Sequence, residues 1–325
     1  MPYAIRVHRP GGPDELRWEQ VEVGEPGASQ VKLRHTAVGL NFIDVYHRTG
    51  QYDQPLPFVP GVEGAGIIES VGPGVDGLMP GDRVAYAGPI GSYAEERLIA
   101  ADRLVKLPEN IGDEQAAAIM LQGMTVDMLI SSVRPVKRGD TILIHAAAGG
   151  VGLLLCQWAS ALGATVIGTV SSDEKAELAR ANGCHHPIVY TRGDFVAEVD
   201  RITNGRKLPV VYDSVGRDTF LRSLDCLQKR GMMVSFGQSS GPVEPFAPRL
   251  LAQKGSLFLT RPTLFDYIAS PEELRISAAR LFDAFRTGMV KADIGQRFPL
   301  SQAAEAHRAL ESRQTVGSTV LTVER

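Results

Sequence analysis

The sequence predicts an α/β protein in which a doubly wound parallel sheet accompanies a second, β-rich domain. From about Gln122 onward, short apolar runs alternate with helical segments, the order that a parallel sheet needs because its crossovers usually carry helices. Up to about Leu107, by contrast, short strand-like runs are broken by glycine and proline, as in a compact β-rich domain with many turns. A chain of 325 residues is also long for one core, so two domains are expected.

Composition narrows the class of protein. The chain is 44% hydrophobic and 22% charged with a net charge of −3, which offers nothing to attract nucleic acid or an anionic membrane. No apolar run approaches a membrane span, and the opening MPYAIRVHRP lacks the apolar core of a signal peptide, so we expect a cytoplasmic protein. The cysteines Cys156, Cys184 and Cys226 are widely spaced, which argues against a disulfide framework or a CxxC metal site and predicts structural roles.

The expected elements follow in order along the chain. Strands of the β-rich domain are expected in YAIRVH, QVKLRHTAV, GAGIIESVG, GDRVAYA and AEERLIA. Strands of the parallel sheet are expected in TILIH, ATVIGTV, PIVY, PVVYD, MMVSFG and SLFLT, with helices in DEKAELARAN and DFVAEVDRIT. After Arg261 a helix near EELRISAARLFDAF and a last strand near STVLTV no longer alternate in this way. This tail can return to complete the first domain, which would make the parallel-sheet domain an insertion.

A glycine-rich turn, AAAGGVG, joins the strand at 141–145 to a helix. Read as G-x-G-x-x-G, it has Ala147 in the first place, followed by Gly149 and Gly152, with an extra Gly150. Apolar residues mark one face of the helix: Val151, Leu154, Leu155, Trp158, Ala159 and Leu162. Gly149 would let the backbone approach a pyrophosphate at the helix N-terminus, and Gly152 would let helix and strand pack closely. The alternative is a tight turn without a ligand. We favour dinucleotide binding, because the turn opens a series of strand–helix units.

The end of the next strand bears on the choice between NAD and NADP. An NAD site usually has Asp or Glu there, bonded to the ribose hydroxyls, but this strand ends at Val170 and is followed by Ser171 and Ser172. Lys175, one helical turn further on, can pair with a 2′-phosphate, or it can be a solvated helix lysine behind an N-cap at Ser172. Asp173 could instead face the ribose. We expect NADPH.

Several motifs together identify a family. AAAGGVGLLLCQWASALGA, VVYDSVG, GMMVSFGQSSG, NFIDVYHRTGQY and VPGVEGAGIIESVG resemble the zeta-crystallin-like NADPH:quinone oxidoreductases of the medium-chain dehydrogenase/reductase superfamily, over essentially the whole chain. The resemblance implies a GroES-like catalytic domain at residues 1–122 and 262–325, with a Rossmann NADPH-binding domain at 123–261 inserted in it and an active-site cleft where they meet. It also implies a homodimer in which the strand near Ser256–Thr260 pairs with its copy, which would protect an apolar sheet edge.

The zinc motifs of related alcohol dehydrogenases are missing. Their Gly-His-Glu motif corresponds to Gly61, Val62 and Glu63, so valine replaces the histidine, and no cysteine precedes Cys156. The four-cysteine structural zinc lobe is absent as well. Because zinc needs several nitrogen or sulfur ligands at once, we expect a protein without zinc.

The resemblance places candidate catalytic residues in NFID and QGMTV. Asn41 and Asp44 would lie beside the nicotinamide ribose and Thr125 near the nicotinamide, although a turn and helix start would also explain Asn and Asp. Tyr46 and Tyr52 can stack on a flat ring and donate an O–H to a carbonyl, or they can be ordinary core or rim tyrosines.

The resemblance implies further cofactor contacts. Gly150 and Val151 would lie at the pyrophosphate, Ser171 and Lys175 at the 2′-phosphate, and Tyr190 by the adenine. The loops after two later strands would add Ser214, Val215, Gly237, Gln238, Ser239 and Ser240. From the tail, Arg313 can reach the 2′-phosphate or form a surface ion pair.

These residues predict an NADPH-dependent quinone reductase that transfers hydride from the nicotinamide to a quinone without a metal. One alternative is a reductase of activated C=C bonds in enals, enones or enoyl thioesters, which would also need a proton donor such as Tyr46 or Tyr52. Another is an NADPH-binding protein with little turnover. No nucleic-acid or membrane partner is expected.

Overall fold

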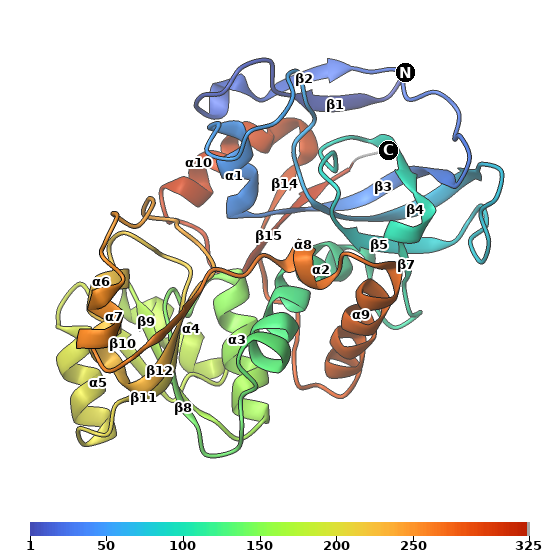
Figure 1. Cartoon of the computed structure of the whole chain (residues 1–325). Coiled ribbons are helices and arrows are strands. Elements are labelled where there is room, and N and C mark those ends of the chain that lie inside the picture. Colours follow the sequence, from blue (N-terminus) through green and yellow to red (C-terminus); the bar gives the residue numbers. More distant parts are fainter. Residues whose placement is uncertain (324–325) are drawn as a thin grey trace. The chain divides into compact units, whose positions relative to one another are not determined.

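The computed structural model describes residues 1–323, and the chain divides into two compact units (Figure 1). The first unit contains Met1–Met124, Ile268–Arg286 and the chain from Ala292 onward, and the second contains Thr125–Tyr267 and Thr287–Lys291. The sequence boundaries drawn after residues 122 and 261 lie two and six residues before these divisions, and the short segment Thr287–Lys291 was not anticipated. The second unit is inserted in the first, so both ends of the chain belong to the first unit.

A seven-stranded sheet organises the first unit, with strand order β14-β15-β3-β4-β5-β7 and β6 paired to β3. Its strands are β3 (Gln30–Leu40), β4 (Glu63–Val71), β5 (Arg83–Ala87), β6 (Glu96–Ala100), β7 (Val105–Lys106), β14 (Ile294–Pro299) and β15 (Ser318–Thr322). The tail completes this sheet, because β15 runs antiparallel to β3 with Thr319 opposite Leu40, while β14 pairs with β15 in parallel. β1 (Tyr3–Arg6) and β2 (Arg17–Gln20) form a separate antiparallel ribbon.

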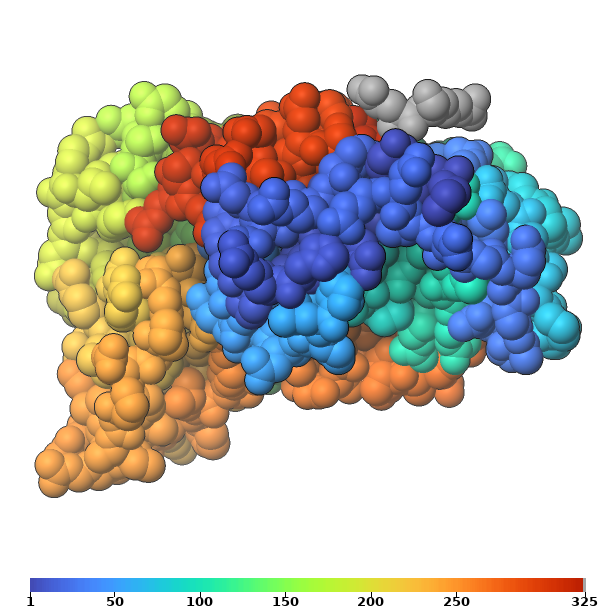
Figure 2. Space-filling model, turned by 90° about the horizontal axis from the view of Figure 1, so that it is seen from above, coloured from blue at the N-terminus to red at the C-terminus, as the bar shows by residue number. Residues whose placement is uncertain are grey.

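Helices of the first unit join its N-terminal and C-terminal segments. They are η1 (Pro13–Glu15), α1 (Phe42–Arg48), η2 (Ala101–Arg103), α2 (Asp113–Asp127), α9 (Pro271–Arg286), η5 (Leu300–Gln302) and α10 (Ala303–Glu311). Figure 2 shows the blue N-terminal segment against the red C-terminal segment, where Arg308 of α10 pairs with Asp14 of η1. Below this surface the Arg48 side chain, 1% exposed, donates to both carboxylate oxygens of Glu311 at 2.8 and 2.9 Å. The two ends of the chain therefore share one core.

The second unit is built on a six-stranded parallel sheet with the order β10-β9-β8-β11-β12-β13. Its strands are β8 (Thr141–Ile144), β9 (Thr165–Val170), β10 (His186–Val189), β11 (Leu208–Asp213), β12 (Leu227–Ser235) and β13 (Phe258–Thr260). Its helices are α3 (Gly150–Ala161), α4 (Asp173–Ala181), α5 (Phe195–Thr203), α6 (Phe220–Ser223), η4 (Leu224–Cys226), α7 (Arg249–Gln253) and α8 (Leu264–Tyr267). Strand order reverses between β8 and β11, and ligands of such sheets bind at the carboxyl ends of the strands beside that reversal. The doubly wound fold is confirmed.

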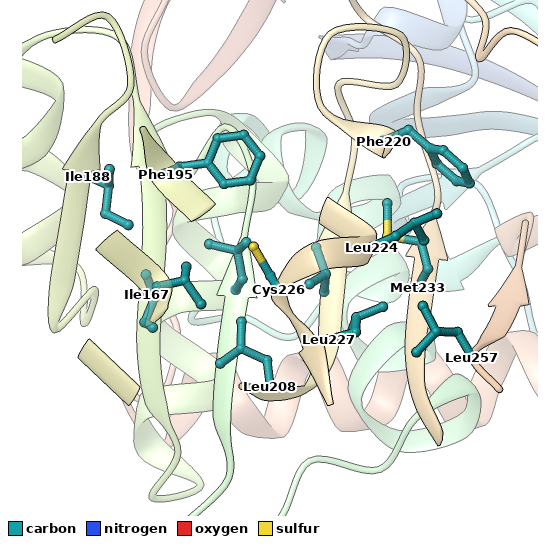
Figure 3. Close-up of a cluster of buried hydrophobic side chains, with 13 residues drawn as sticks. Ile167, Ile188, Phe195, Leu208, Phe220, Leu224, Cys226, Leu227, Met233 and Leu257 are labelled. Atoms are coloured by element: carbon teal, nitrogen blue, oxygen red, sulfur yellow. The ribbon is translucent and has the colours of Figure 1, made fainter. Parts of the chain in front are cut away.

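One face of this sheet is covered by α5, α6 and η4. Figure 3 shows Phe195 of α5 and Phe220 of α6 in one cluster with the strand residues Ile167, Leu208 and Met233. All of these side chains are at most 4% exposed. Their burial fixes this face of the sheet as apolar, in keeping with the β-branched and leucine-rich strands of the sequence.

The helix after the glycine turn is buried more completely than its periodicity predicts. Leu153 and Cys156 are buried along with the expected Leu154, Leu155 and Trp158, whereas Val151 and Leu162 are only half-buried. The single apolar face was therefore too narrow a prediction. The end of the helix agrees with its sequence, in which Gly163 follows the apolar run and indicates a helix stop: Gly163 adopts φ +86°, a left-handed conformation that favours glycine.

One long apolar helical stretch corrects the expectation about membrane spans. The helix over residues 113–133, α2 with the π-helical turn η3 (Met128–Val133), is long and apolar enough to cross a membrane by composition. However, 78% of its apolar window is buried inside the fold. This is the burial of a core helix.

Candidate cofactor and active sites

The glycine turn in the second unit is shaped by close contacts between backbones. A Cβ on Gly152 would lie 2.2 Å from the carbonyl oxygen of Ala146 and 2.9 Å from the Cα of Ala147, so only glycine fits. Ala146 itself has φ +54°, and the Ala147 N–H donates to the Thr169 carbonyl oxygen of β9 at 3.0 Å. Gly152 therefore lets the start of α3 pack closely against the turn at Ala146 and Ala147.

The N-terminus of α3 fits a phosphate group. Gly149 is the N-cap residue, no side chain caps the helix, and its first turn contains no acidic residue. A Cβ on Gly149 would meet only the Ala146 carbonyl oxygen, at 3.3 Å, so this glycine is not required by packing in the way that Gly152 is. Unsatisfied N–H groups and the positive end of the helix dipole favour an anion beside Gly150 and Val151.

The polar residues at the end of β9 include both a helix cap and candidates for binding a 2′-phosphate. Ser172 is the N-cap of α4 and accepts the backbone N–H of Lys175 at 3.3 Å, which leaves Ser171 and the Lys175 side chain as the candidates for a 2′-phosphate. The Asp173 carboxylate, which we considered for the ribose, forms an ion pair with Arg192. Arg192 was not singled out in the sequence, where it is one arginine in a polar loop, yet it adds a cation to this edge of the sheet.

Tyr190 is the first residue after β10 and lies two residues before Arg192. Its side chain is 40% exposed, and its backbone N–H donates to the Val170 carbonyl oxygen at the end of β9. Thr191 Oγ1 donates to the Ser171 carbonyl oxygen at 3.1 Å. The loops after β9 and β10 are therefore held together, which puts the backbones at Ser171 and Tyr190 on one sheet edge.

The loops after β11 and β12 are also joined. Asp213, buried at the end of β11, accepts the N–H groups of Val215 at 2.7 Å and Gly216 at 3.1 Å, together with the Thr219 hydroxyl at 2.9 Å. The Ser240 hydroxyl donates to the Val215 carbonyl oxygen at 2.8 Å, and the Ser239 N–H to the Ser214 carbonyl oxygen.

Gly237 is required at this junction of loops. A Cβ there would lie 2.6 Å from the Ser214 carbonyl oxygen. Arg261 donates to the carbonyl oxygens of Ser235 at 3.0 Å and Gly237 at 2.9 Å, and its other nitrogen lies 3.4 Å from Gln238 Oε1. The candidate residues after β11 and β12 thus form one rigid rim, and Asp213 and Arg261, which the sequence did not single out, hold it.

In the first unit, the motif NFID begins a helix. Asn41 is the N-cap of α1, and its N–H donates to Asp44 Oδ2 at 2.9 Å in a capping box. The alternative of a turn and helix start is thus confirmed, and it does not exclude a second role for Asn41. Its amide faces a buried polar cluster, because Nδ2 donates to Glu63 Oε2 at 2.7 Å and Oδ1 accepts from Gln122 at 3.1 Å.

Asp44 is fully buried, with one oxygen engaged and one not. The Tyr93 hydroxyl donates to Oδ2 at 3.1 Å, whereas Oδ1 has no hydrogen-bond partner. Burial raises the pKa of Asp44 to about 7, because removal from water disfavours the charged form more than these donors stabilise it. Tyr93 in turn lies 3.1 Å from His307 Nε2, and Arg48 lies 2.9 Å from His307 Nδ1, so a polar chain runs from α1 to α10.

The two tyrosines of NFIDVYHRTGQY lie together. Their ring centroids are 5.3 Å apart in an edge-to-face arrangement, with Tyr46 buried and Tyr52 36% exposed. The Tyr52 N–H donates to the Tyr46 carbonyl oxygen at 3.1 Å. His47 adds a third ring at 5.9 Å from that of Tyr52. The segment thus presents one partly exposed aromatic ring backed by two others.

Two candidates lie elsewhere in the chain. Thr125 is the first residue of the second unit and lies one helical turn after Gln122 in α2. Arg313 belongs to the first unit, follows α10 and adopts φ +59°. The cysteines Cys156, Cys184 and Cys226 are free and buried.

Comparison with known proteins follows the same division of the chain. The profile of the alcohol dehydrogenase GroES-like domain matches residues 27–109, and that of a zinc-binding dehydrogenase matches residues 150–275. The chain is 51% identical over 313 residues to a quinone oxidoreductase of Pseudomonas aeruginosa, covering 96% of each. It is 47% identical over 330 residues to a 2-haloacrylate reductase of a Burkholderia species, covering 99% of each.

A solved structure of another quinone oxidoreductase also matches this chain over nearly its whole length. The Escherichia coli quinone oxidoreductase complexed with NADPH matches with a TM-score of 0.97 and 46% identity, covering 98% of this chain and 99% of that one. Although one matching profile carries zinc in its description, Val62 stands in place of the motif histidine, and within residues 1–323 no three His, Cys, Asp or Glu side chains form a group that could hold a metal ion. The sequence and structure matches show that the chain belongs to the quinone oxidoreductases of the medium-chain dehydrogenase/reductase superfamily.

Proposed function

We propose that this chain catalyses the reduction of a quinone by NADPH through direct hydride transfer. The observation that carries the proposal is the pair of polar loops at the end of β9 and β10, where the Asp173 carboxylate is paired with Arg192 and the Glu174 carboxylate is hydrogen-bonded to Ser172. A 2′-phosphate there would meet Ser171, Lys175 and Arg192 rather than a free acid. The NADPH complex of the related E. coli enzyme supports the same cofactor.

The residues of the second unit fit the rest of the dinucleotide. The uncapped N-terminus of α3 would take the pyrophosphate against Gly149, Gly150 and Val151, with Gly152 as the close-packing residue behind it. Tyr190 would lie along the adenine. The joined rim after β11 and β12 would hold the nicotinamide end through Ser214, Val215, Gly237, Gln238, Ser239 and Ser240.

The bound nicotinamide supplies a hydride, and the protein residues orient its acceptor. A quinone has conjugated carbonyls that accept two electrons readily, so the residues need only align it and stabilise the developing oxyanion. We assign alignment to the Tyr52 ring, backed by Tyr46, and oxyanion stabilisation to the Asn41 amide, with Thr125 and Arg313 as further contacts to the cofactor. Solvent protonates the hydroquinone anion, so Asp44, fully buried behind Asn41, acts on helix α1 rather than on the substrate.

The similarity to 2-haloacrylate reductase supports a second candidate substrate class, an activated C=C bond. That reaction needs the same hydride and a proton at the adjacent carbon, which would make the Tyr52 hydroxyl an acid rather than an aligning group. Removal of the Tyr52 hydroxyl therefore distinguishes the two functions. Tyr52→Phe would abolish C=C reduction but preserve most quinone reduction.

The proposed assembly is a homodimer in the cytoplasm. β13 lies at the end of the parallel sheet with β12 as its only strand partner among the described residues, and Phe258 and Leu259 are 57% and 38% exposed. Pairing with the same strand of a second copy would cover this apolar edge.

One assay tests the function. NADPH oxidation is followed in parallel with a small quinone, an enone, an enoyl thioester and a 2-haloacrylate, and repeated with NADH. We expect turnover with the quinone that exceeds all the others, and faster with NADPH than with NADH. Faster turnover of a C=C substrate would establish the second candidate, and tight NADPH binding without turnover of any acceptor would refute catalysis.

A further inference from the structure

Four buried side chains in the first unit form a continuous line of hydrogen bonds that ends at a carboxylate. Ser318 Oγ of β15 lies 2.8 Å from Gln122 Oε1, Gln122 Nε2 donates to Asn41 Oδ1, and Asn41 Nδ2 donates to Glu63 Oε2. Each of the four is at most 9% exposed. The residues come from β15, α2, the N-cap of α1 and β4, so the line exists only in the folded unit.

The carboxylate end of this line is a built site. Glu63 is fully buried, and its second oxygen accepts the Leu121 N–H at 2.7 Å. A Cβ on the neighbouring Gly39 would lie 2.3 Å from both Glu63 Oε2 and the Ala117 carbonyl oxygen. The glycine thus leaves the space in which the carboxylate lies against α2.

The ionised form of Glu63 determines the direction of every bond in the line. A carboxylate only accepts, so Asn41 must turn its NH₂ group toward Glu63 and its oxygen toward Gln122. Gln122 must then donate to Asn41 and accept from Ser318. Asn41 keeps one further N–H on the Glu63 side of its amide for a ligand, while its oxygen, on the Gln122 side, also faces the Asp44 N–H in the capping box.

The protonated form of Glu63 reverses the same line without losing a bond. A carboxylic acid donates, which calls for the Asn41 oxygen on the Glu63 side and the NH₂ group on the Gln122 side, and Gln122 then donates to Ser318. Ser318 Oγ can accept this bond because the Ala118 carbonyl oxygen lies 3.0 Å away and takes its hydroxyl proton instead. The three bonds of the line are therefore satisfied in both directions by the same heavy-atom positions, and the reversed direction gives up only the capping contact between the Asn41 oxygen and the Asp44 N–H.

The surroundings of Glu63 raise its pKa into the pH range where both the ionised and the protonated carboxyl are populated. Burial raises its pKa to about 8, and the charge of Asp44 contributes to the increase, while the bonds from Asn41, Leu121 and Met120 oppose it. The other titratable groups that interact with it are the hydroxyls of Tyr86 and Tyr93. No Lys or Arg within residues 1–323 forms an ion pair with Glu63 or contributes to its pKa shift.

We propose that Glu63 is a positioning residue that acts through Asn41, with its protonation deciding which side of the Asn41 amide offers a donor and which an acceptor to the bound ligand. The proposal rests on the function proposed above, in which Asn41 contacts the reacting oxygen. Loss of the proton puts an N–H on the Glu63 side, and gain of the proton puts an oxygen there, so the reaction senses pH through one amide.

The variant Glu63→Gln tests this because it imitates the protonated form. The Gln side chain accepts from Leu121 with its oxygen and donates to Asn41 with its nitrogen, so the reversed line is complete and the fold is preserved. We expect the pH dependence of kcat/KM for the quinone in the wild type to show a step between about pH 7 and about pH 9. The variant is expected to coincide with the low-pH limb of the wild type and to lack the step.

Two further measurements keep the test decisive. Glu95→Gln removes another carboxylate that accepts a backbone N–H, from Tyr3 at 2.7 Å in the same unit, and is expected to keep the wild-type pH profile. Titration of the ¹³C-labelled Glu63 carboxyl, assigned by its absence in Glu63→Gln, is expected to show a midpoint matching the kinetic step.

The outcomes separate the two proposals. A kinetic step that survives in Glu63→Gln, or a carboxyl that does not titrate in that pH range, overturns the positioning role. A wild type that reduces no quinone overturns the proposed function instead. In that case the carboxyl titration, with the pH dependence of the NADPH dissociation constant in wild type and variant, still decides whether Glu63 controls Asn41.

Discussion

Arg192, two residues after Tyr190, forms an ion pair with Asp173, the first residue of α4. The pair offsets the charge of the Asp173 carboxylate, which would otherwise repel a 2′-phosphate bound near Ser171 and Lys175. Because both side chains are more than 60% exposed, the pair itself contributes little to stability, and its expected effect is on cofactor choice.

Arg192→Ala is therefore expected to raise the KM for NADPH about tenfold, which corresponds to about 1.4 kcal/mol, and to change the KM for NADH far less. Steady-state kinetics with both cofactors measure this. Arg201→Ala is the matched control, since Arg201 pairs with Glu198 on α5 in the same way. Equal losses for the two cofactors would show that Arg192 does not serve the 2′-phosphate.

The two glycines at the start of α3 are expected to differ. Gly152→Ala places a methyl group 2.2 Å from the Ala146 carbonyl oxygen, so it should destabilise the second unit by about 3 kcal/mol. Gly149→Ala meets that oxygen only at 3.3 Å and should preserve the fold while weakening NADPH binding. Urea unfolding and fluorescence titration with NADPH distinguish these effects. Unchanged NADPH affinity in Gly149→Ala would argue that the pyrophosphate lies elsewhere.

Asp213 is expected to support cofactor binding without touching the cofactor. Asp213→Ala leaves the N–H groups of Val215 and Gly216 and the Thr219 hydroxyl without their acceptor and should cost about 2 kcal/mol of folding free energy. Loosening of the Val215 loop should also raise the NADPH dissociation constant several-fold. Asp213→Asn keeps one acceptor oxygen and is expected to recover most of both losses. Isothermal titration calorimetry and thermal unfolding provide the two readouts.

The edge strand β13 gives a prediction about assembly. Phe258→Asp with Leu259→Asp places one charge on each face of this exposed edge strand, which should convert a dimer into a monomer with little change in the fold of the second unit. Sedimentation equilibrium measures the mass. Tyr267→Asp, another exposed apolar residue of that unit outside β13, serves as the control. A dimer that persists in the double variant would place the interface on another surface.

Two buried carboxyl groups predict how stability changes with pH. The pKa values of Asp44 and Glu63 are raised to about 7 and about 8, so between about pH 4 and about pH 8 the folded chain binds more protons than the unfolded chain. Their contribution to the free energy of unfolding therefore falls as pH rises through this window and stays low above it.

Urea unfolding at several pH values and constant ionic strength measures this decline. Asp44→Asn and Glu63→Gln are each expected to flatten it, because a neutral amide cannot lose a proton. Asp82→Asn, which changes a half-buried carboxyl whose pKa is lowered by Lys106, should not flatten it. If the free energy of unfolding fell equally with pH in the wild type, Asp44→Asn and Glu63→Gln, the decline would not come from these two carboxyl groups.

The sequence predicted the elements that are determined by local patterns. The glycine turn, the stop at Gly163 and the strands of the parallel sheet follow from residues adjacent in the chain, and all are found in the structure. The resemblance extended this to the insertion of one domain in the other. Burial around α3 was underestimated because periodicity reports one helix face, whereas the contacts on the other faces depend on neighbouring elements.

The polar cluster around Asn41 could not be predicted in the same way. Asn41 and Gln122 are 81 residues apart, and Arg48 and Glu311 are 263 apart, so no local pattern connects them. Glu63 was noticed only as a remnant of a zinc motif, and its burial beside Gly39 depends on the pairing of β3 with β4. Asp213, Arg192 and Arg261 looked like ordinary charged residues, because what distinguishes them is the backbone or partner they reach in the fold.

The pairing of β15 with β3 has a consequence for how the chain folds as it is made. The second unit is nearly continuous, so most of it has left the ribosome and can fold while the first unit still lacks β14, β15 and α10. Until those last segments emerge, β3 presents an open edge on the side where β15 will lie, and Arg48 has no carboxylate to bind. Nascent chains that stall late in translation should therefore expose an aggregation-prone half beside a finished nucleotide-binding half.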